Sequence, residues 1–72
     1  MTMDVFQKNE LKAHILALAT HTARSVLFQD IAHTREVEGK KEQSDKYWRR
    51  SQEESEYADR KQAYIWELID KL

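Results

Sequence analysis

Glu38-Gly39-Lys40 is the segment that decides the fold, because it holds the only glycine of the 72-residue chain. Glycine adopts the left-handed backbone conformation that ends a helix without the steric penalty of other residues. No proline occurs anywhere in the chain, and no other strong helix breaker lies on either side of Gly39. The sequence therefore predicts one long helix before this segment and another after it.

The predicted fold is all-α: an antiparallel, coiled-coil-like two-helix hairpin that forms a single domain over residues 1–72. We expect a helix over about 3–38, a turn over about 39–41 and a helix over about 42–71. One glycine and no proline are too few turn residues for a small β-rich fold. Since no cysteine is present, no disulfide reinforces so small a core. We expect oligomerisation or a partner chain to complete the hairpin.

Two alternative caps begin the first helix. Thr2 is one N-cap, with Asp4 near the positive end of the helix and with Met1 and Phe6 placed as a hydrophobic staple. Asp4 with Gln7 forms the other, as a capping box. Both alternatives start the helix within the first few residues.

Apolar residues cover well over half of the circumference of the first helix at about 100° per residue. They are Val5, Phe6, Leu11, Ile15, Leu16, Leu18, Ala19, Ala23, Val26, Leu27 and Ile31. The polar residues form a narrow stripe of Gln7, Glu10, His14, His21 and Ser25. One neighbouring helix cannot cover so wide an apolar face. We therefore expect burial against two or more helices, from a second copy or from a different protein.

The second helix carries a heptad-like seam with small residues in its middle. The predicted seam consists of Trp48, Ser51, Ser55, Ala58, Gln62, Ile65, Ile69 and Leu72. Ser44 is an expected N-cap, although a start a few residues earlier is the alternative. In an antiparallel hairpin that turns near residue 40, the numbers of facing residues add up to about 80. This register pairs Leu16 with Tyr64 and Ala23 with Tyr57.

Charge and hydropathy exclude several classes of protein. Twelve basic and 13 acidic residues leave a net charge of −1, which gives no overall attraction to nucleic acid or to an anionic membrane. The longest apolar run, at residues 15–19, is far shorter than the ~20 residues of a membrane span. Asp4, Glu10 and His14 interrupt the region before it, which argues against a signal peptide. We expect a cytoplasmic protein without a membrane partner.

Two groups of histidine and carboxylate side chains have metal-ligand spacing. Glu10 and His14 lie four residues apart, and Asp30, His33 and Glu36 follow at three-residue spacing. Di-iron bundles need such motifs from two helices, and the second helix contains no histidine. We interpret the histidines as exposed or interfacial residues hydrogen-bonded to neighbours, and we predict no metal site and no cofactor. Without a glycine-rich phosphate loop or a sharply exposed nucleophile, we expect no enzyme.

Association surfaces are the strongest functional signal. Large aromatic residues flank the seam near the open end of the hairpin, and such residues are frequent anchors of interfaces. We predict a non-catalytic protein–protein interaction module of cochaperone, adaptor or inhibitor type, whose partner is another protein chain in a homo-oligomer or hetero-complex. The predicted partner-binding residues are Leu11, Ile15, Leu18, Val26, Tyr64, Ile65, Trp66 and Ile69.

The alternative function is a small regulator that binds nucleic acid or nucleotide through the basic–aromatic segment 40–50. Lysine and arginine contact phosphate, and exposed tyrosine stacks on bases. The residues of this alternative are Lys40, Lys41, Lys46, Tyr47, Arg49 and Arg50. Glu38, Glu42 and Asp45 lie within helical reach and neutralise much of the positive charge.

Two stretches of the second helix, Tyr47-Trp48-Arg49 and Ala63-Tyr64-Ile65-Trp66-Glu67-Leu68-Ile69, resemble the small helical-hairpin cochaperones of type III secretion needle subunits. Members of that family are chains of similar length with two antiparallel helices. Their second helix carries an aromatic pair near its start and an aliphatic–aromatic end. The resemblance implies a hairpin that binds a helical-repeat chaperone, which holds a polymerisation-prone subunit.

Overall fold

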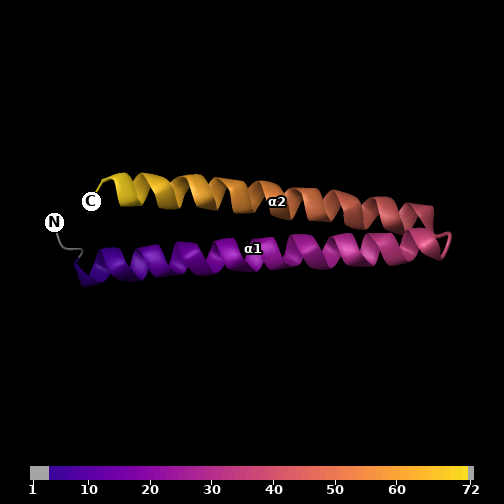
Figure 1. The fold of residues 1–72 in the computed structure, drawn as a ribbon, viewed down its shortest axis with the longest axis horizontal. Helices are drawn as coiled ribbons and strands as arrows, with labels where there is room; N and C mark the ends of the chain where they lie inside the picture. Colours follow the sequence, from indigo (N-terminus) through magenta and orange to yellow (C-terminus); the bar gives the residue numbers. More distant parts are fainter. Residues whose placement is uncertain (1–3, 72) are drawn as a thin grey trace.

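The computed structural model describes residues 4–71, which form two long α-helices joined by a tight turn (Figure 1). Helix α1 comprises Val5–Val37 and helix α2 comprises Lys41–Asp70. The helices run antiparallel, so the first turn of α1 and the last turn of α2 lie at the same end of the molecule. The structure confirms the all-α helical hairpin predicted from the single glycine.

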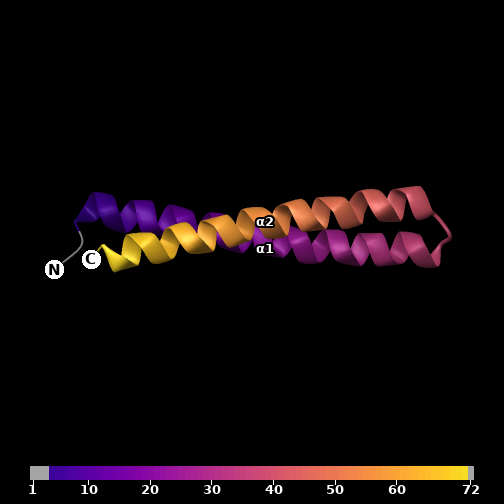
Figure 2. The same ribbon diagram turned by 90° about the horizontal axis from the view of Figure 1, so that it is seen from above.

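The hairpin is a narrow rod with principal dimensions of 56 × 15 × 11 Å. The helices lie side by side in one view and cross near the middle of their length in the other, as helices of a coiled coil do (Figure 2). A rod of this width has one layer of side chains between its two helices. Each helix therefore keeps most of its circumference outside the contact.

Helix α1 begins with a capping box. The Asp4 carboxylate accepts a hydrogen bond from the Gln7 backbone N–H at 2.7 Å, and Gln7 Oε1 accepts one from the Asp4 N–H at 3.2 Å. These bonds satisfy backbone donors that have no partner within the helix. This is one of the two predicted starts. The other, with Thr2 as the cap and Met1 in a staple, lies outside the described residues.

Gly39 ends α1 in the predicted left-handed conformation, with φ at +79°. Its N–H donates to the Glu36 carbonyl at 3.0 Å, and the Lys40 N–H donates to the Arg35 carbonyl at 2.8 Å. This pair of bonds is a Schellman motif, which satisfies the last carbonyls of a helix. Helix α2 then starts at Lys41, so the earlier of its two expected starts is the one observed. Ser44 lies within the helix.

One set of the buried and half-buried positions between the helices recurs every seven residues in each helix. We call these positions the heptad seam; they are Leu11, Leu18, Ser25 and Ala32 in α1, and Ser44, Ser51, Ala58 and Ile65 in α2. Three members of the predicted α2 seam are confirmed as buried, namely Ser51, Ala58 and Ile65. The others are wrong or outside the described residues. Trp48, Ser55, Gln62 and Ile69 are exposed, and Leu72 is not described.

The predicted register is also wrong. The His14 ring centroid lies 4.6 Å from that of Tyr64, and the His21 centroid lies 5.3 Å from that of Tyr57, so these residue numbers add up to 78. Leu16 faces Tyr64 in the predicted register, but in the structure its side chain is 67% exposed. The reason is the compact Schellman turn, which reverses the chain direction before residue 40. With this turn, the polar stripe of α1 faces α2.

The narrow polar stripe of α1 is therefore its inner face, and much of its wide apolar face points outward. The buried hydrophobic residues among those described are Ala32, Ala58 and Ile65, and no large side chain within residues 4–71 is fully buried. Small and polar groups dominate this contact. Consequently, much of the apolar side-chain surface of α1 remains on the outside of the hairpin.

Candidate protein-interaction surface

Two buried serines form the middle of the heptad seam. The Ser25 hydroxyl donates to the Ser51 carbonyl at 3.1 Å, and the Ser51 hydroxyl donates to the Ser25 carbonyl at 3.0 Å. Toward the turn, the Ser44 hydroxyl donates to the Ala32 carbonyl at 2.9 Å. Buried hydroxyls need such partners to offset the loss of water. Because serine and alanine are small, the two backbones come close enough for these bonds to form.

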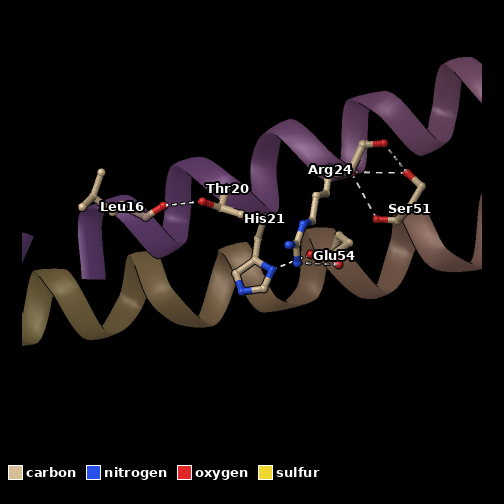
Figure 3. Close-up of polar contacts among 7 residues, drawn as sticks. Leu16, Thr20, His21, Arg24, Ser51 and Glu54 are labelled. Atoms are coloured by element: carbon tan, nitrogen blue, oxygen red, sulfur yellow. Dashed lines mark hydrogen bonds and ion pairs between the residues drawn. The ribbon is translucent and has the colours of Figure 1, made fainter. Parts of the chain in front are cut away.

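Next to the serines, His21 of α1 points at Glu54 of α2 (Figure 3). The His21 Nδ1–H donates to Glu54 Oε2, and Arg24 Nη1 lies 4.0 Å from Glu54 Oε1. The His21 ring also stacks on Tyr57. The Glu54 side chain is only 17% exposed, so its carboxylate depends on these two partners.

His14 repeats this arrangement two turns nearer the open end. Lys61 Nζ donates to His14 Nδ1 at 3.3 Å, and His14 Nε2 lies 3.9 Å from Glu10 Oε1. An ammonium group only donates, so Nδ1 is the acceptor nitrogen of His14. Tyr64 meets the ring edge-on and donates to Glu10 at 3.5 Å. His14 and His21 thus lie at the contact between the helices and are hydrogen-bonded to neighbours, as we predict from the sequence.

The interfacial serines and histidines set the register of the hairpin, because each of these side chains has a specific partner in the opposite helix. Within residues 4–71, no group of three or more histidine, aspartate or glutamate side chains is arranged to hold a metal ion. At Glu10 and His14, the Lys61 ammonium is the cation that the structure places beside the pair. The chemistry of the seam is therefore structural recognition between the two helices.

The turn carries a small ion-pair network around Glu38. Lys40 Nζ lies 3.1 Å from Glu38 Oε2, and Arg35 Nη1 lies 3.3 Å from the same atom. The hydrogen bond from Lys40 is the main reason why the pKa of the Glu38 carboxyl is lowered from its ordinary value, and the charges of Lys40 and Arg35 add to the effect. These contacts tie the end of α1 to the start of α2.

The side of α1 turned away from α2 is apolar over most of its length. We call this surface the outer face of α1; its residues, all exposed, are Val5, Phe6, Asn9, Lys12, Ala13, Leu16, Ala19, Thr20, Ala23, Val26, Leu27, Asp30, His33, Thr34 and Val37. Leu16 is 67% exposed, Val26 53% and Leu27 54%. Figure 3 shows Leu16 on the side of α1 that points away from α2. Extended exposed apolar surfaces are typical of interaction sites, which makes this face the candidate surface.

Two threonines on the outer face increase its apolar character. Thr20 Oγ1 donates to the Leu16 carbonyl at 2.9 Å, and Thr34 Oγ1 donates to the Asp30 carbonyl at 3.0 Å. A hydroxyl that bonds to the carbonyl four residues earlier is satisfied within its own helix. Neither threonine therefore needs a polar partner when the outer face is covered.

The predicted partner-binding residues fall into two groups. Five are exposed: Ile15 at 47%, Val26 at 53%, Tyr64 at 42%, Trp66 at 58% and Ile69 at 40%. The other three, Leu11, Leu18 and Ile65, lie in the heptad seam, where Ile65 is only 8% exposed. Because those three pack α1 against α2, they are not available as anchors in this structure. Only Val26 of the predicted set belongs to the outer face of α1.

Sequence reasoning missed several residues of this surface as interface anchors, above all Leu16, Leu27, Phe6 and Val37. Phe6 is 78% exposed and Val37 is 76% exposed. The rotation per residue of a helix could have placed these residues on the outer face, as Leu16 illustrates. At about 100° per residue, Leu16 lies about 200° around the helix from His14. Once His14 is known to face α2, Leu16 must face away.

The residues of the nucleic-acid alternative lie around the turn and the first turns of α2. Tyr47 is half-buried, with its ring centroid 6.0 Å from that of Phe28, and the Arg50 guanidinium lies 5.7 Å from the Tyr47 ring. Lys40 pairs with Glu38. The remaining three residues, Lys41, Lys46 and Arg49, are exposed. The tyrosine that was expected to stack on a base is thus held between the helices.

Comparisons of this chain with protein-family models, with curated proteins and with solved structures gave no significant match. Neither helix has, over its described residues, a stretch both long and apolar enough to cross a membrane.

Proposed function

We propose that this chain is a non-catalytic protein–protein interaction module that buries the outer face of α1 against another protein chain. The observation that carries the proposal is the inverted distribution of polarity in the hairpin. Leu16, Val26 and Leu27 are more than half exposed, whereas Ser25 and Ser51 are buried. A hairpin that functioned alone would gain more from the opposite arrangement, because burial of apolar surface is the main stabilising contribution in folding.

The energetics of burial support this proposal. Covering one leucine or valine side chain completely contributes about 1.5–3 kcal/mol. The heptad seam supplies little of this, since its buried apolar members among the described residues are two alanines and Ile65. Small domains with such limited cores rely on another source of stability. A partner on the outer face would provide it.

The cochaperone type is the finer form of the proposal. The resemblance to needle-subunit cochaperones lies in Tyr47-Trp48-Arg49 and in residues 63–69. Trp48 is 43% exposed and Trp66 is 58% exposed, so both indoles are accessible to a partner. Trp48 also lines an open hollow of about 520 Å³ together with Gln29 and Arg49. Tryptophan is among the residues most enriched at the energetically important positions of interfaces.

Site-specific photo-crosslinking in the source cell tests the proposal. A photoreactive residue at Leu16 or Leu27 is expected to give a discrete protein adduct, because both side chains lie on the outer face. The matched control is a photoreactive residue at Glu53 or Glu56, which are exposed on α2. Equal adducts at all four positions, or none at Leu16 and Leu27, would contradict the proposal.

A charge-reversal variant separates the proposed function from nucleic-acid binding. Arg49→Glu combined with Arg50→Glu should leave the adducts at Leu16 and Leu27 unchanged, since neither arginine belongs to the outer face of α1. Loss of those adducts on charge reversal, together with salt-dependent binding of the original chain to an oligonucleotide, would favour the basic segment instead.

A further inference from the structure

Ten of the 15 residues of the outer face of α1 form five pairs at equal distances on either side of residue 21. Ala19 and Ala23 lie two residues on either side of that point, and Leu16 and Val26 lie five. Lys12 and Asp30 lie nine residues on either side. Small residues thus occupy the centre, large aliphatic residues flank them, and opposite charges follow at equal distances.

From this symmetry we propose that the outer face binds a second copy of the same chain, with the two α1 helices antiparallel and related by a two-fold axis at the level of residue 21. In such a contact each surface patch meets its own copy, so residue pairs occur twice. Leu16 meets Val26 of the partner subunit, and Ala19 meets Ala23 of the partner subunit. This dimer rests on the proposed interaction function and specifies its partner.

Charge complementarity determines the orientation. Lys12 is the lysine of the outer face, and Asp30 is its only carboxylate. Neither side chain takes part in an ion pair among the described residues. In the antiparallel dimer, Lys12 meets Asp30 of the partner subunit at both ends of the contact. A parallel dimer would place like charges together, which disfavours it. The apolar residues supply affinity, and these two charges select the direction.

The centre of the outer face permits the helices to approach closely. Ala19, Thr20 and Ala23 are small, and the Thr20 hydroxyl is already bonded to the Leu16 carbonyl. No buried donor is therefore left without a partner when a second helix covers this region. Trp48 and Trp66 are exposed on α2, but charged residues such as Glu42 and Glu56 interrupt its outer side, so the outer face of α1 is the better surface for this contact.

Light scattering after size-exclusion chromatography of the full chain tests the dimer over a concentration series. The original chain should be dimeric. Lys12→Asp alone and Asp30→Lys alone should each raise the dissociation constant about tenfold or more, since two favourable pairs become two repulsive ones. The double variant Lys12→Asp/Asp30→Lys should restore the dimer. The matched double variant Lys46→Asp/Glu56→Lys on α2 should leave the dissociation constant unchanged.

Mixing the two single variants gives the sharpest result. The Lys12→Asp chain has two acidic side chains on the face and the Asp30→Lys chain has two basic ones, so the mixture should form a heterodimer that neither chain forms with itself. Circular dichroism follows helicity in the same samples. If a single variant loses its helices together with its partner, helicity should return on mixing.

Disulfide formation reports the orientation, because the chain has no cysteine of its own. Val5→Cys mixed with Val37→Cys should crosslink, whereas Val5→Cys alone should not. Self-crosslinking of Val5→Cys would indicate parallel helices and overturn the antiparallel dimer.

A monomer at every concentration would also overturn the dimer. If Leu16 then crosslinks to a different protein in cells, the interaction function stands and only the self-association fails. A monomer without any adduct contradicts both proposals. Binding of the monomer to lipid vesicles through the outer face would likewise replace the dimer.

Discussion

Ser25 and Ser51 exchange hydrogen bonds across the hairpin, each hydroxyl donating to the backbone carbonyl of the other residue. These residues lie 26 positions apart in the chain and are 7% and 3% exposed. The exchange requires two backbones in close contact at one register. A slip of one residue would bury two hydroxyls without these partners. Together with Ser44 and the two interfacial histidines, this pair specifies how α1 and α2 align.

Substitution of Ser51 should show how much the serine pair contributes. Ser51→Ala removes one of the two exchanged bonds and is expected to lower the free energy of unfolding by about 1 kcal/mol relative to the control Ser55→Ala. Ser55 is exposed on the same helix, so the control carries the same gain in helix propensity. Ser51→Leu should cost about 1–3 kcal/mol, because it separates the helices. Denaturant unfolding at fixed protein concentration measures both, and a neutral Ser51→Leu would contradict this account of the seam.

Removal of the Glu54 carboxylate should destabilise the hairpin more than removal of an exposed carboxylate beside it on α2. Glu54→Ala leaves His21 and Arg24 without their acceptor and is expected to lower stability by about 1–2 kcal/mol. Glu53→Ala is the matched control, because Glu53 is exposed and adjacent. A double-mutant cycle with His21→Ala isolates the interaction of the pair. Additive effects of the two substitutions would show that the bond between them contributes nothing.

The stability of Gly39 variants should depend only on how readily the new residue adopts a positive φ. A Cβ atom at this position would meet no other atom within 4 Å, so crowding does not enter. Gly39→Ala is expected to cost about 1 kcal/mol, because φ is +79°. Gly39→Asn should cost less, since asparagine adopts the left-handed region more readily. Thermal unfolding of the three chains checks this order, and equal stability of all three would contradict it.

The Glu38 network should stabilise the hairpin at neutral pH and lose its effect in acid. Since the pKa of Glu38 is lowered in the folded chain, the folded state favours the carboxylate. That contribution is present above the ordinary glutamate value of 4.5 and is lost as the pH falls through the lower folded value. Glu38→Gln should therefore melt slightly below the original chain at pH 7, and the difference should disappear once the pH has fallen below the lowered pKa of Glu38 in the folded chain. A difference that is independent of pH would exclude the ion pairs as its cause.

The local features of the chain were predictable because their causes are local. The capping box of Asp4 and Gln7, the end of α1 at Gly39 and the continuity of both helices depend on residues within one turn of each other. The positions facing the partner helix were not predictable in the same way. Trp48 was expected in the seam because it is apolar and suitably spaced, yet the seam at that level is made of serines.

The residues of the candidate interaction surface were likewise predictable only in part. Val26 was predicted as an anchor and lies on the outer face of α1, whereas Ile65 was predicted and is buried. Leu16 was missed because the apolar positions of α1 were treated as one wide face. Which part of that face remains free depends on how α2 lies against it.

By itself, the sequence determined two long helices, their reversal at Gly39 and an excess of apolar surface on the first helix, since caps, breakers and helical periodicity act over a few residues. Only the tertiary structure decided which side of α1 faces α2. The polar stripe is the inner side because its partners Ser51, Glu54 and Lys61 are supplied by α2, far away in the chain. A buried polar group is stable only where a partner is placed beside it, and that placement is a property of the folded hairpin. The same choice leaves the apolar side of α1 as the surface open to a second chain.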